Sequence, residues 1–357
     1  MSTVNERYAR QMQLPGFGAA GQEALGRSHV AVVGAGGLGS PALLYLAAAG
    51  VGRITIIDDD VVDLSNLHRQ VLHTTSRVGV PKVDSAREAI AELNPCVEVE
   101  VVRGRLTWPN APHILRGADV VLDGADNFET RHVVSASCAR LGIPHVWGAI
   151  LGWEAQLSFF HAGHAPIYED LFPSPPPPGS VPSCAQAGVL GPVVGVVGSA
   201  MALEAITYLC GCGRTHAGRV AVYDAWRSTW SEIPLHRDPA VTKRIIEQGP
   251  PLPTPVPTTT EIPPEATLID VREPVEFAAG SIPGAQNIPL SRIRVEPGEV
   301  ASHVRASQTA VLFCQRGSRS EDAIRLLQEC DECSTTTPRL LSLHGGYEGW
   351  MQRGGSR

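Results

Sequence analysis

Two groups of residues, far apart in the sequence, have types and spacing that suit chemistry. In the first, a glycine loop over 34–39 follows the apolar run 29–33, and Asp58 stands nineteen residues beyond the loop. Backbone N–H groups and a helix N-terminus at such a loop can approach phosphates, and the carboxylate can bind ribose hydroxyls. This pattern alone most often indicates NAD or FAD. The glycines of the loop are Gly34, Gly36, Gly37 and Gly39.

The polar residues after Asp58 suit a triphosphate better than a dinucleotide. A guanidinium can bind phosphate through two N–H groups, an ammonium supplies a point charge, and one carboxylate can hold Mg²⁺. Arg69, Lys82 and Asp126 supply these three groups in chain order. The sequence therefore predicts a site for ATP and Mg²⁺, with Asp126 as the metal ligand. Neighbouring residues expected to line the site are Ser65, Asn66, Leu67, His68 and Asn127.

The second group is a cysteine loop over 314–319, which lies between an apolar run (310–313) and an expected helix (320–328). The successive N–H groups of such a loop and the helix N-terminus would stabilise a thiolate, and they would hold a terminal persulfide sulfur in the same way. Two arginines of the loop, one of them Arg319, add positive charge. We therefore expect Cys314 to carry sulfur.

Strands and helices alternate along the first half of the chain, which places the nucleotide-type residues at strand ends. The alternation predicts a doubly wound, parallel α/β sheet. A second, smaller α/β unit is expected around the cysteine loop. The expected strands of the first unit are 29–33, 53–58, 118–122, 144–149 and 155–160, and the expected helices are 40–49, 82–93 and 128–141.

A proline-rich segment separates the two parts. Seven prolines occur among the seventeen residues 248–264, with no pattern of a buried core. We expect a first domain over 1–237, a linker over 238–266 and a second domain over 267–357. A flexible linker of that length spans about 30 Å on average, which would keep the cysteine loop at high effective concentration near the first site.

Composition argues against several classes of function. With 29 Lys and Arg against 36 Asp and Glu, the net charge of -7 argues against a nucleic-acid-binding protein. No secretory signal opens the chain, so we expect a cytoplasmic protein whose eight cysteines are reduced. The longest apolar stretch (187–203) contains Pro192 and several glycines, and we expect a buried helix there and no membrane span.

A set of motifs runs through the first domain: Arg7-Tyr-Ala-Arg10-Gln11, the glycine loop, residues 65–70, Lys82 and 123–127. With these motifs, the stretch from Arg7 to about Pro239 resembles the MoeB/ThiF family, bacterial relatives of ubiquitin-activating enzymes. The resemblance implies a Rossmann-like domain that binds ATP and Mg²⁺ and forms a homodimer. It implies adenylation of the C-terminal glycine of a ubiquitin-like sulfur carrier protein that ends in Gly-Gly. It also implies that Arg10 reaches into the partner subunit's ATP site.

The same resemblance bears on the cysteines. In similar proteins the cysteine at the position of Cys184 forms a covalent link with the carrier's C-terminus. Many relatives bind zinc through two Cys-x-x-Cys pairs, but no cysteine occurs at 165–168 or near Asp238, so we expect no zinc. A structural zinc site needs four ligands. The remaining pairs, Cys330 with Cys333 and Cys210 with Cys212, would combine only in an improbable geometry.

Three further motifs accompany the cysteine loop: 270–272, 280–285 and 345–350. With them the second domain resembles a rhodanese domain, which implies sulfur transfer through a persulfide on Cys314. The spacing from Cys314 to Arg319 fits this family, because related phosphatases use a loop one residue longer that fits phosphate. Ser281 replaces the common histidine of the family's Gly-His-Ile-Pro-Gly pattern. An inactive, regulatory rhodanese domain is the alternative.

Together the two domains resemble the MoeZ-type adenylyltransferase/sulfurtransferases over nearly the whole chain. The resemblance implies that persulfide sulfur on Cys314 attacks the acyl-adenylate of the carrier and that Cys184 resolves the intermediate to a thiocarboxylate. A cysteine desulfurase or thiosulfate would supply the sulfur. Three alternatives stay open: an NAD-dependent oxidoreductase, a ubiquitin-type activator with the rhodanese as a docking module, and an enzyme that activates a peptide natural product.

Overall fold

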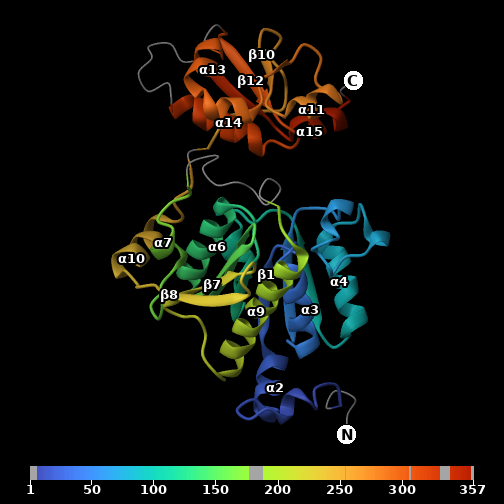
Figure 1. Cartoon of the computed structure of the whole chain (residues 1–357), viewed down its shortest axis with the longest axis vertical. Helices are drawn as coiled ribbons and strands as arrows, with labels where there is room; N and C mark the ends of the chain where they lie inside the picture. The colour runs from blue at the N-terminus through green and yellow to red at the C-terminus, as the bar shows by residue number, and fades with distance from the viewer. Residues whose placement is uncertain (1–5, 177–187, 254, 305–306, 330–337, 355–357) are drawn as a thin grey trace. The chain divides into compact units, whose positions relative to one another are not determined.

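The computed structural model describes residues 6–176, 188–253, 255–304, 307–329 and 338–354. The chain divides into two compact units, and the boundary that joins them along the chain falls after Leu252. Each unit has its own sheet and its own hydrophobic core (Figure 1).

The first unit is built on an eight-stranded sheet in the order β3-β2-β1-β4-β5-β6-β7-β8. The first five strands of that order are parallel, as predicted, and the other three are antiparallel. The parallel prediction was therefore wrong for 155–160, because a two-residue turn at 152–153 returns the chain directly, and Gly152 has the positive φ (61°) that such a turn requires. The strands are β1 (His29–Val33), β2 (Arg53–Asp58), β3 (Glu98–Arg103), β4 (Val120–Asp123), β5 (His145–Leu151), β6 (Glu154–Phe160), β7 (Arg219–Asp224) and β8 (Thr229–Pro234).

Helices cover both faces of this sheet because β1 is apolar on both. Successive side chains of a strand point to opposite faces. Val30 and Val32 face the core that contains α3, α4 and α9, whereas Ala31 and Val33 face the core that contains α5 and α6. The predicted doubly wound α/β class is thereby confirmed. The helices of this unit are α2 (Gly18–Arg27), α3 (Gly39–Ala49), α4 (Lys82–Leu93), α5 (Ala111–Ile114), α6 (Phe128–Leu141), α7 (Tyr168–Leu171), α9 (Gly191–Cys210) and α10 (Pro239–Gln248).

Helix α9 accounts for the longest apolar stretch of the sequence. Among the described residues it is the helix that is long and apolar enough to cross a membrane, by length and composition alone. It packs against α3 and against β4, β5 and β6, and Val197 and Met201 lie in the core of the unit. Near its end the buried carboxylate of Glu204 binds His216 at 2.7 Å. The core helix of a globular protein can have the same length and apolar composition, and these contacts place α9 in the core of the unit.

The second unit has a five-stranded parallel sheet in the order β11-β10-β12-β13-β9. The central strand β12 alternates in the same way as β1: Leu312 faces the core that contains α12, α13 and α14, and Phe313 faces the side covered by α15. The elements are β9 (Thr258–Thr259), β10 (Thr267–Asp270), α11 (Pro274–Ala278), β11 (Gln286–Asn287), α12 (Leu290–Val295), α13 (Pro297–Val304), β12 (Thr309–Phe313), α14 (Ser318–Glu329), β13 (Arg339–Leu343) and α15 (Gly346–Gln352).

The segment 238–266, predicted as a linker, contains regular structure. Asp238 caps α10 by accepting a hydrogen bond from the Ala240 N–H at 2.7 Å, and a proline follows at the first helical position. Ile245 is buried in a cluster with residues of α6. Further on, strand β9 joins the second sheet. The linker prediction therefore does not hold over its full length, because a capped helix and a strand pack onto the two units.

The connection between the two cores is short. Leu252 packs against the core formed by α5 and α6, and Val256 is buried in the core of the second unit. Four residue steps separate these two anchored side chains, and an extended chain spans at most about 14 Å over that length.

Candidate functional site

The nucleotide-type residues lie at one edge of the first sheet. Strands β1, β2 and β4 are neighbours and run parallel, so their carboxyl ends meet there. Their last residues are Val33, Asp58 and Asp123. In open α/β sheets, ligands bind in the crevice outside the carboxyl ends of the strands. The glycine loop and the segment 124–127 extend from this edge, where the sequence predicted a binding site.

Close backbone approach requires two glycines of the loop. A Cβ on Gly39 would lie 1.9 Å from the carbonyl oxygen of Gly34. Gly34 itself has φ 90°, and its Cβ would lie 3.1 Å from the oxygen of Gly124. The tight turn starts α3 at Gly39, and the first N–H groups of a helix have no acceptor within it. The loop therefore presents backbone donors suited to an anion.

Asp58 is fixed beside the glycine loop. Its two carboxylate oxygens accept hydrogen bonds from the N–H groups of Ala35 and Asp60, each at 2.8 Å. Burial raises the pKa of Asp58, and the nearby Lys82 ammonium offsets part of that shift. Each oxygen keeps a lone pair for a further donor. This geometry suits the predicted contact with ribose hydroxyls.

Two cations lie near the glycine loop and Asp58. The Lys82 ammonium, whose side chain is only 6% exposed, donates to Asp60 at 2.8 Å. The guanidinium of Arg69 donates to the Ser65 carbonyl at 3.1 Å and contacts the His68 ring nitrogen at 2.8 Å. A Cβ on Gly37 would lie 3.9 Å from the Arg69 Cδ, so the arginine stem runs along the glycine loop.

The segment 65–68 is held by a short 3-10 helix, η2 (Leu64–Asn66). Asp63 caps it by accepting the Ser65 N–H at 2.7 Å. The amide of Asn66 donates to the Ser65 hydroxyl at 3.5 Å, and Leu67 and His68 follow directly. The cap thus orients the residues that precede Arg69.

Asp126 offers an accessible carboxylate at the end of β4. It is exposed, and the Asn127 amide donates to its carboxylate over a long distance of 3.5 Å. Asn127 has a structural role, because its side-chain oxygen accepts a hydrogen bond from the Thr130 N–H at 2.9 Å and so caps α6. Mg²⁺ is commonly held by one or two carboxylates together with phosphates. Asp126 fits such a ligand, whereas Asn127 acts as a helix cap.

Arg131, which the sequence analysis missed, fixes the backbone before Asp126. Its Nε and Nη2 both donate to the Ala125 carbonyl, at 3.1 and 3.0 Å. The Ala125 N–H donates to the buried carboxylate of Asp123 at 2.9 Å. Phe128 and Trp147 flank the guanidinium. Both polar groups of Ala125 are therefore held, and Asp126 extends from a fixed position.

Two other buried side chains support the glycine loop. The Nε2–H of His73 donates to the Ala35 carbonyl, and its Nδ1 pairs with the Ser85 hydroxyl, both at 2.9 Å. Burial lowers the pKa of His73. Gln70 is 4% exposed, its amide nitrogen lies 3.6 Å from a Cβ placed on Gly36, and its Oε1 has no partner. A buried, unpaired acceptor next to a phosphate-type loop fits a ligand that donates a hydrogen bond, as a nucleotide does.

One predicted residue lies away from this edge, and another lies outside the described residues. Arg10 is exposed, and the neighbouring Tyr8 packs against Gly50. Gly50 precedes β2, so this part of the chain lies at the amino end of the strand, at the edge of the sheet opposite Asp58. The action of Arg10 in a partner subunit stays a prediction. Cys184 lies outside the described residues, and its covalent role stays a prediction as well.

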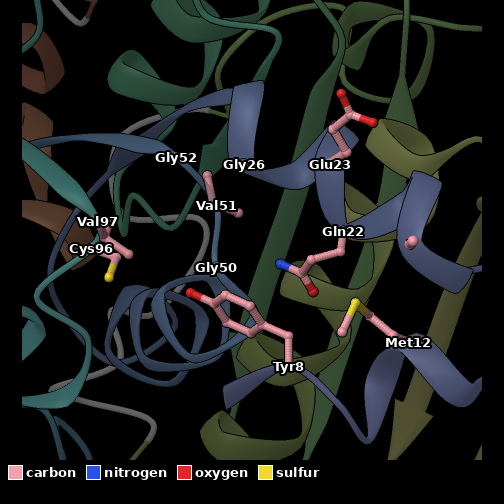
Figure 2. A pocket seen from close by; sticks show the side chains of 11 residues that line it. Tyr8, Met12, Gln22, Glu23, Gly26, Gly50, Val51, Gly52, Cys96 and Val97 are labelled. Atoms are coloured by element: carbon pink, nitrogen blue, oxygen red, sulfur yellow. The ribbon is translucent and has the colours of Figure 1, made fainter. Parts of the chain in front are cut away.

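A cavity of about 360 Å³ lies at that opposite edge (Figure 2). Tyr8, Met12 and Gln22 line it together with the turn 50–52 and Cys96. Six residue steps along β2 separate Gly52 at the end of this turn from Asp58, which corresponds to roughly 20 Å of strand. The cavity is therefore distinct from the nucleotide-type site.

In the second unit, Cys314 follows the central strand and begins the predicted loop. Its sulfur accepts a hydrogen bond from the Gly317 N–H at 3.0 Å and lies 4.0 Å from the Ser320 hydroxyl. The side chain is only 1% exposed. The backbone of α15 closes the other side, where the Tyr347 N–H donates to the Cys314 carbonyl at 2.8 Å. One of the backbone donors predicted around the Cys314 sulfur, the Gly317 N–H, is therefore in place.

Arg319 lies next to the sulfur but is paired with a carboxylate. Its Nη1 and Nη2 donate to the two oxygens of Glu276 on α11, each at 2.7 Å. This hydrogen bonding raises the pKa of Arg319, and the Cys314 sulfur adds a smaller contribution of the same sign. The sequence analysis missed Glu276, whose partner is 43 residues away.

Ser281, which replaces the family's histidine, has a structural partner. Its hydroxyl donates to the buried carboxylate of Asp270 at 2.6 Å. The same carboxylate binds Arg272, whose Nη2 also donates to the Gly280 carbonyl at 2.7 Å. The serine therefore completes a buried polar network under the cysteine loop, so the loop keeps its support without the histidine.

The two segments where many relatives carry a Cys-x-x-Cys pair, 165–168 and the residues near Asp238, are joined in this protein by hydrogen bonds. The carboxylate of Asp170 accepts the Ile167 N–H at 2.8 Å and the Asp238 N–H at 3.0 Å. Ile167 and Ile245 pack in one buried cluster. These contacts connect the segment 165–168 to the start of α10. Within the described ranges, no group of three or more His, Cys, Asp or Glu residues could hold a metal, and Cys330 and Cys333 lie outside them.

We predict that removal of metals leaves the stability of the first unit unchanged. Incubation with EDTA should shift the melting temperature by less than about 1 °C, because hydrogen bonds and apolar burial hold the segments that zinc joins in relatives. Differential scanning fluorimetry and elemental analysis of the purified protein measure this. Stoichiometric zinc, or a marked fall in melting temperature with EDTA, would contradict the prediction.

The two sites define the class of the protein. One unit presents a nucleotide-type site with cations and an accessible carboxylate, and the other presents a cysteine loop suited to sulfur. The model of the ThiF family matches residues 8–243, and the model of the rhodanese-like domain matches residues 260–353. The chain belongs to the ThiF family and carries a C-terminal rhodanese-like domain.

Three curated relatives agree with this assignment. The chain is 40% identical to a probable adenylyltransferase/sulfurtransferase MoeZ of Mycobacterium tuberculosis, over 97% of this chain and 93% of the relative. It is 50% identical to a sulfur carrier protein adenylyltransferase of Thermus thermophilus, over 66% of this chain and 88% of the relative. It is 36% identical to the adenylyltransferase and sulfurtransferase MOCS3-1 of Zea mays, over 96% of this chain and 81% of the relative. The protein is therefore an enzyme of the adenylyltransferase and sulfurtransferase type, and not an NAD-dependent oxidoreductase.

Solved structures agree with the fold of the first unit. A crystal structure of E. coli MccB with ATP matches 66% of this chain and 73% of its own, with a TM-score of 0.58 and 22% identity. A crystal structure of E. coli MccB with MccA-N7isoASN matches 67% of this chain and 74% of its own, with a TM-score of 0.60 and 21% identity. At this identity the likeness supports the fold alone.

Proposed function

We propose that this enzyme adenylates the C-terminal glycine of a ubiquitin-like sulfur carrier protein and then converts the adenylate to a thiocarboxylate with sulfur from Cys314. The observation that carries the proposal is the presence in one chain of an ATP-type site and a persulfide-type cysteine loop. The names of the relatives at 40% and 50% identity support both halves.

In the first step, a carboxylate oxygen of the carrier attacks the α-phosphorus of ATP, and pyrophosphate leaves with the electron pair of the broken P–O bond. The backbone donors that follow Gly34 and the guanidinium of Arg69 neutralise phosphate charge, while Asp58 holds the ribose. Lys82 adds a point charge from its place beside Asp60. Mg²⁺ would be held by Asp126, and it would supply charge neutralisation for the phosphates.

In the second step, the terminal sulfur of the Cys314 persulfide attacks the carbonyl carbon of the adenylate, and AMP leaves. The product is an acyl disulfide that joins the carrier to Cys314. A thiolate of Cys184 then attacks the Cys314 sulfur and releases the thiocarboxylate as the leaving group. The two cysteines remain as a disulfide, which an external thiol reductant returns to two thiols.

Exposed apolar side chains supply surfaces for protein partners. Along β8 and the turns beside it, Trp226 (74% exposed), Trp230 and Ile233 reach solvent, and β8 is the edge strand of the sheet. A carrier protein could bind this edge. Tyr45 on α3 and Leu203 on α9 are exposed as well, on two helices that pack against each other, and we propose that they contribute to the homodimer that the family resemblance implies.

ATP–pyrophosphate exchange on the purified protein tests the proposal. We expect exchange only when a candidate carrier ending in Gly-Gly is present, and none with a carrier shortened by its last glycine, because the carboxylate must reach the α-phosphorus. Exchange that proceeds without a carrier, or fails with every carrier, would contradict the proposal and favour a peptide or small-molecule substrate.

A further inference from the structure

We propose that Cys210 and Cys212 form a redox-active dithiol, which small-molecule disulfides convert to an intramolecular disulfide, and that this oxidation loosens helix α2. Helix α9 starts beside the glycine loop, where Val194 contacts Gly37, and its 20 residues extend about 30 Å to Cys210. The two cysteines therefore lie far from the nucleotide-type site, at the end of α9 that contacts α2 (Figure 1).

A single glycine separates the two cysteines, and hydrogen bonds fix its backbone. The Gly211 N–H donates to the Tyr208 carbonyl and the Cys212 N–H donates to the Thr207 carbonyl, each at 3.1 Å, which is a common way for a helix to end. Gly211 has φ 61° and ψ 28°, close to the mirror image of helical values. The distance between Cα atoms two residues apart depends on the dihedral angles of the residue between them, so the cysteine Cα atoms lie about 5.4 Å apart, as in a helix. Disulfides most often join Cα atoms about 5.5–6 Å apart.

The two thiols differ in how they meet solvent. Both are free and half-buried. Cys212 stands between two exposed glycines, whereas Cys210 packs against the hydrophobic core of the first unit. Burial raises the pKa of Cys210 to about 11, and the neighbouring Cys212 thiol adds to this shift. The thiolate is the nucleophile in disulfide exchange, so Cys212 is the thiol that reacts first and Cys210 is the second.

Oxidation then proceeds by two exchanges with a small disulfide, R–S–S–R. The Cys212 thiolate attacks one sulfur, a bond forms between Cys212 and that RS group, and the other RS group leaves as a thiolate. The Cys210 sulfur attacks the Cys212 sulfur, and the second RS group leaves. Two protein thiols become one disulfide while one R–S–S–R becomes two R–SH. The fixed position of Cys210 gives it a high effective concentration, which offsets its raised pKa.

Oxidation removes a contact between α9 and α2, two helices that pack against each other. The Cys210 thiol donates to the Gly21 carbonyl of α2 at 3.5 Å. A disulfide sulfur carries no hydrogen, so this donor is lost on oxidation. The next residue of α2, Gln22, binds Gln11 and donates to the Ala49 carbonyl at 3.1 Å. A change at Gly21 therefore acts on the helix that holds the N-terminal segment in place.

The test treats the full chain with oxidised glutathione, unfolds it, blocks free thiols with N-ethylmaleimide and digests it with chymotrypsin. Cleavage after Tyr208 and Tyr223 releases residues 209–223, which contain Cys210 and Cys212 and no other cysteine. We expect this peptide to carry neither maleimide nor glutathione, and to react with maleimide at both cysteines once dithiothreitol has been added. Maleimide on both cysteines before reduction, or glutathione that stays on Cys212, would overturn the proposal.

Two variants report the order of attack. Cys210→Ser should accumulate glutathione on Cys212, because the second exchange is lost, and Cys212→Ser should leave Cys210 free to react with maleimide after unfolding. Cys96→Ser, which removes an exposed thiol of the same unit, is the matched control and should leave oxidation of 209–223 unchanged. Rapid glutathione addition to Cys210 in Cys212→Ser would contradict the order.

A measurement on the reduced wild-type enzyme keeps the test decisive if a variant folds poorly. Phenylarsine oxide bridges two thiols that lie close together, so it should protect residues 209–223 from maleimide. Dithiothreitol should reverse this protection, whereas a monothiol at the same thiol concentration should reverse it far less. Absence of protection would mean that the two thiols do not meet, and would overturn the proposal.

Hydrogen exchange followed by mass spectrometry tests the effect on α2. Oxidation of the wild-type enzyme should speed exchange of the α2 amides about threefold, because one weak hydrogen bond is lost, and should leave β4 unchanged. Cys212→Ser should show no change in α2 after the same treatment. Equal exchange in oxidised and reduced wild-type enzyme would overturn the effect on α2 even where the disulfide forms.

Discussion

The Cys314→Ala enzyme should exchange ATP and pyrophosphate at the wild-type rate and form no thiocarboxylate. The two activities separate because the adenylation residues belong to one sheet and Cys314 follows the central strand of another. Removing a covalent nucleophile should reduce thiocarboxylate formation by about a thousandfold or more. Carrier-dependent exchange and mass spectrometry of the carrier's C-terminus measure the two steps.

A suitable control is Cys96→Ala, which removes an exposed thiol of the first unit at the cavity edge and should change neither activity. Since Cys314 is buried, its replacement by alanine removes packing as well as the thiol, and the melting temperature should be compared with that of the wild type. Undiminished thiocarboxylate from Cys314→Ala would rule out the assignment of Cys314 as the sulfur carrier.

Replacing Asp126 by asparagine should strongly reduce adenylation, the first step of the proposed reaction. The carboxylate is exposed, and the contact that it receives from the Asn127 amide is long (3.5 Å), so the isosteric change should leave the fold intact. Removing one charged group that neutralises or holds charge on a transferring phosphoryl group typically lowers the rate by about 10²–10³. We expect ATP–pyrophosphate exchange to fall by at least about a hundredfold, and the Mg²⁺ concentration for half-maximal exchange to rise.

Glu129→Gln is the matched control for that variant. Glu129 is also exposed, stands three residues further along the chain and forms a loose pair with Arg105 at 3.9 Å. The same change of charge at this position should alter exchange by less than about twofold, as surface pairs contribute little. Normal exchange by Asp126→Asn at saturating ATP and Mg²⁺ would show that Asp126 does not hold the metal.

The parts of the fold that were predictable are those with a local pattern. The apolar run before Gly34 and the glycines after it specify a strand, a tight turn and a helix without reference to other segments. The loop at Cys314 is equally local, and its sulfur receives the expected backbone donor from Gly317. Spacing alone therefore predicted that both loops lie directly after a strand and before a helix.

The supporting side chains were not predictable because their roles depend on distant partners. His73 binds the carbonyl of Ala35, 38 residues earlier, and Glu276 binds Arg319, 43 residues later. In the sequence, each resembles an ordinary polar surface residue. Helix α10 was missed for another reason: the prolines that follow it dominated the composition of the segment, although Asp238 and Pro239 are a good helix start.

The short connection from Leu252 to Val256 changes how sulfur delivery should be pictured. A long flexible tether would let the second unit diffuse through a large volume, so a collision with the first site would be a search. With four residue steps between the two anchored side chains, we expect the connection to act instead as a pivot for the second unit. The distance over which Cys314 can travel is then governed by the radius of its own unit. Lengthening the pivot with glycine and serine would convert a swinging motion into a search, and delivery would become slower as residues are added.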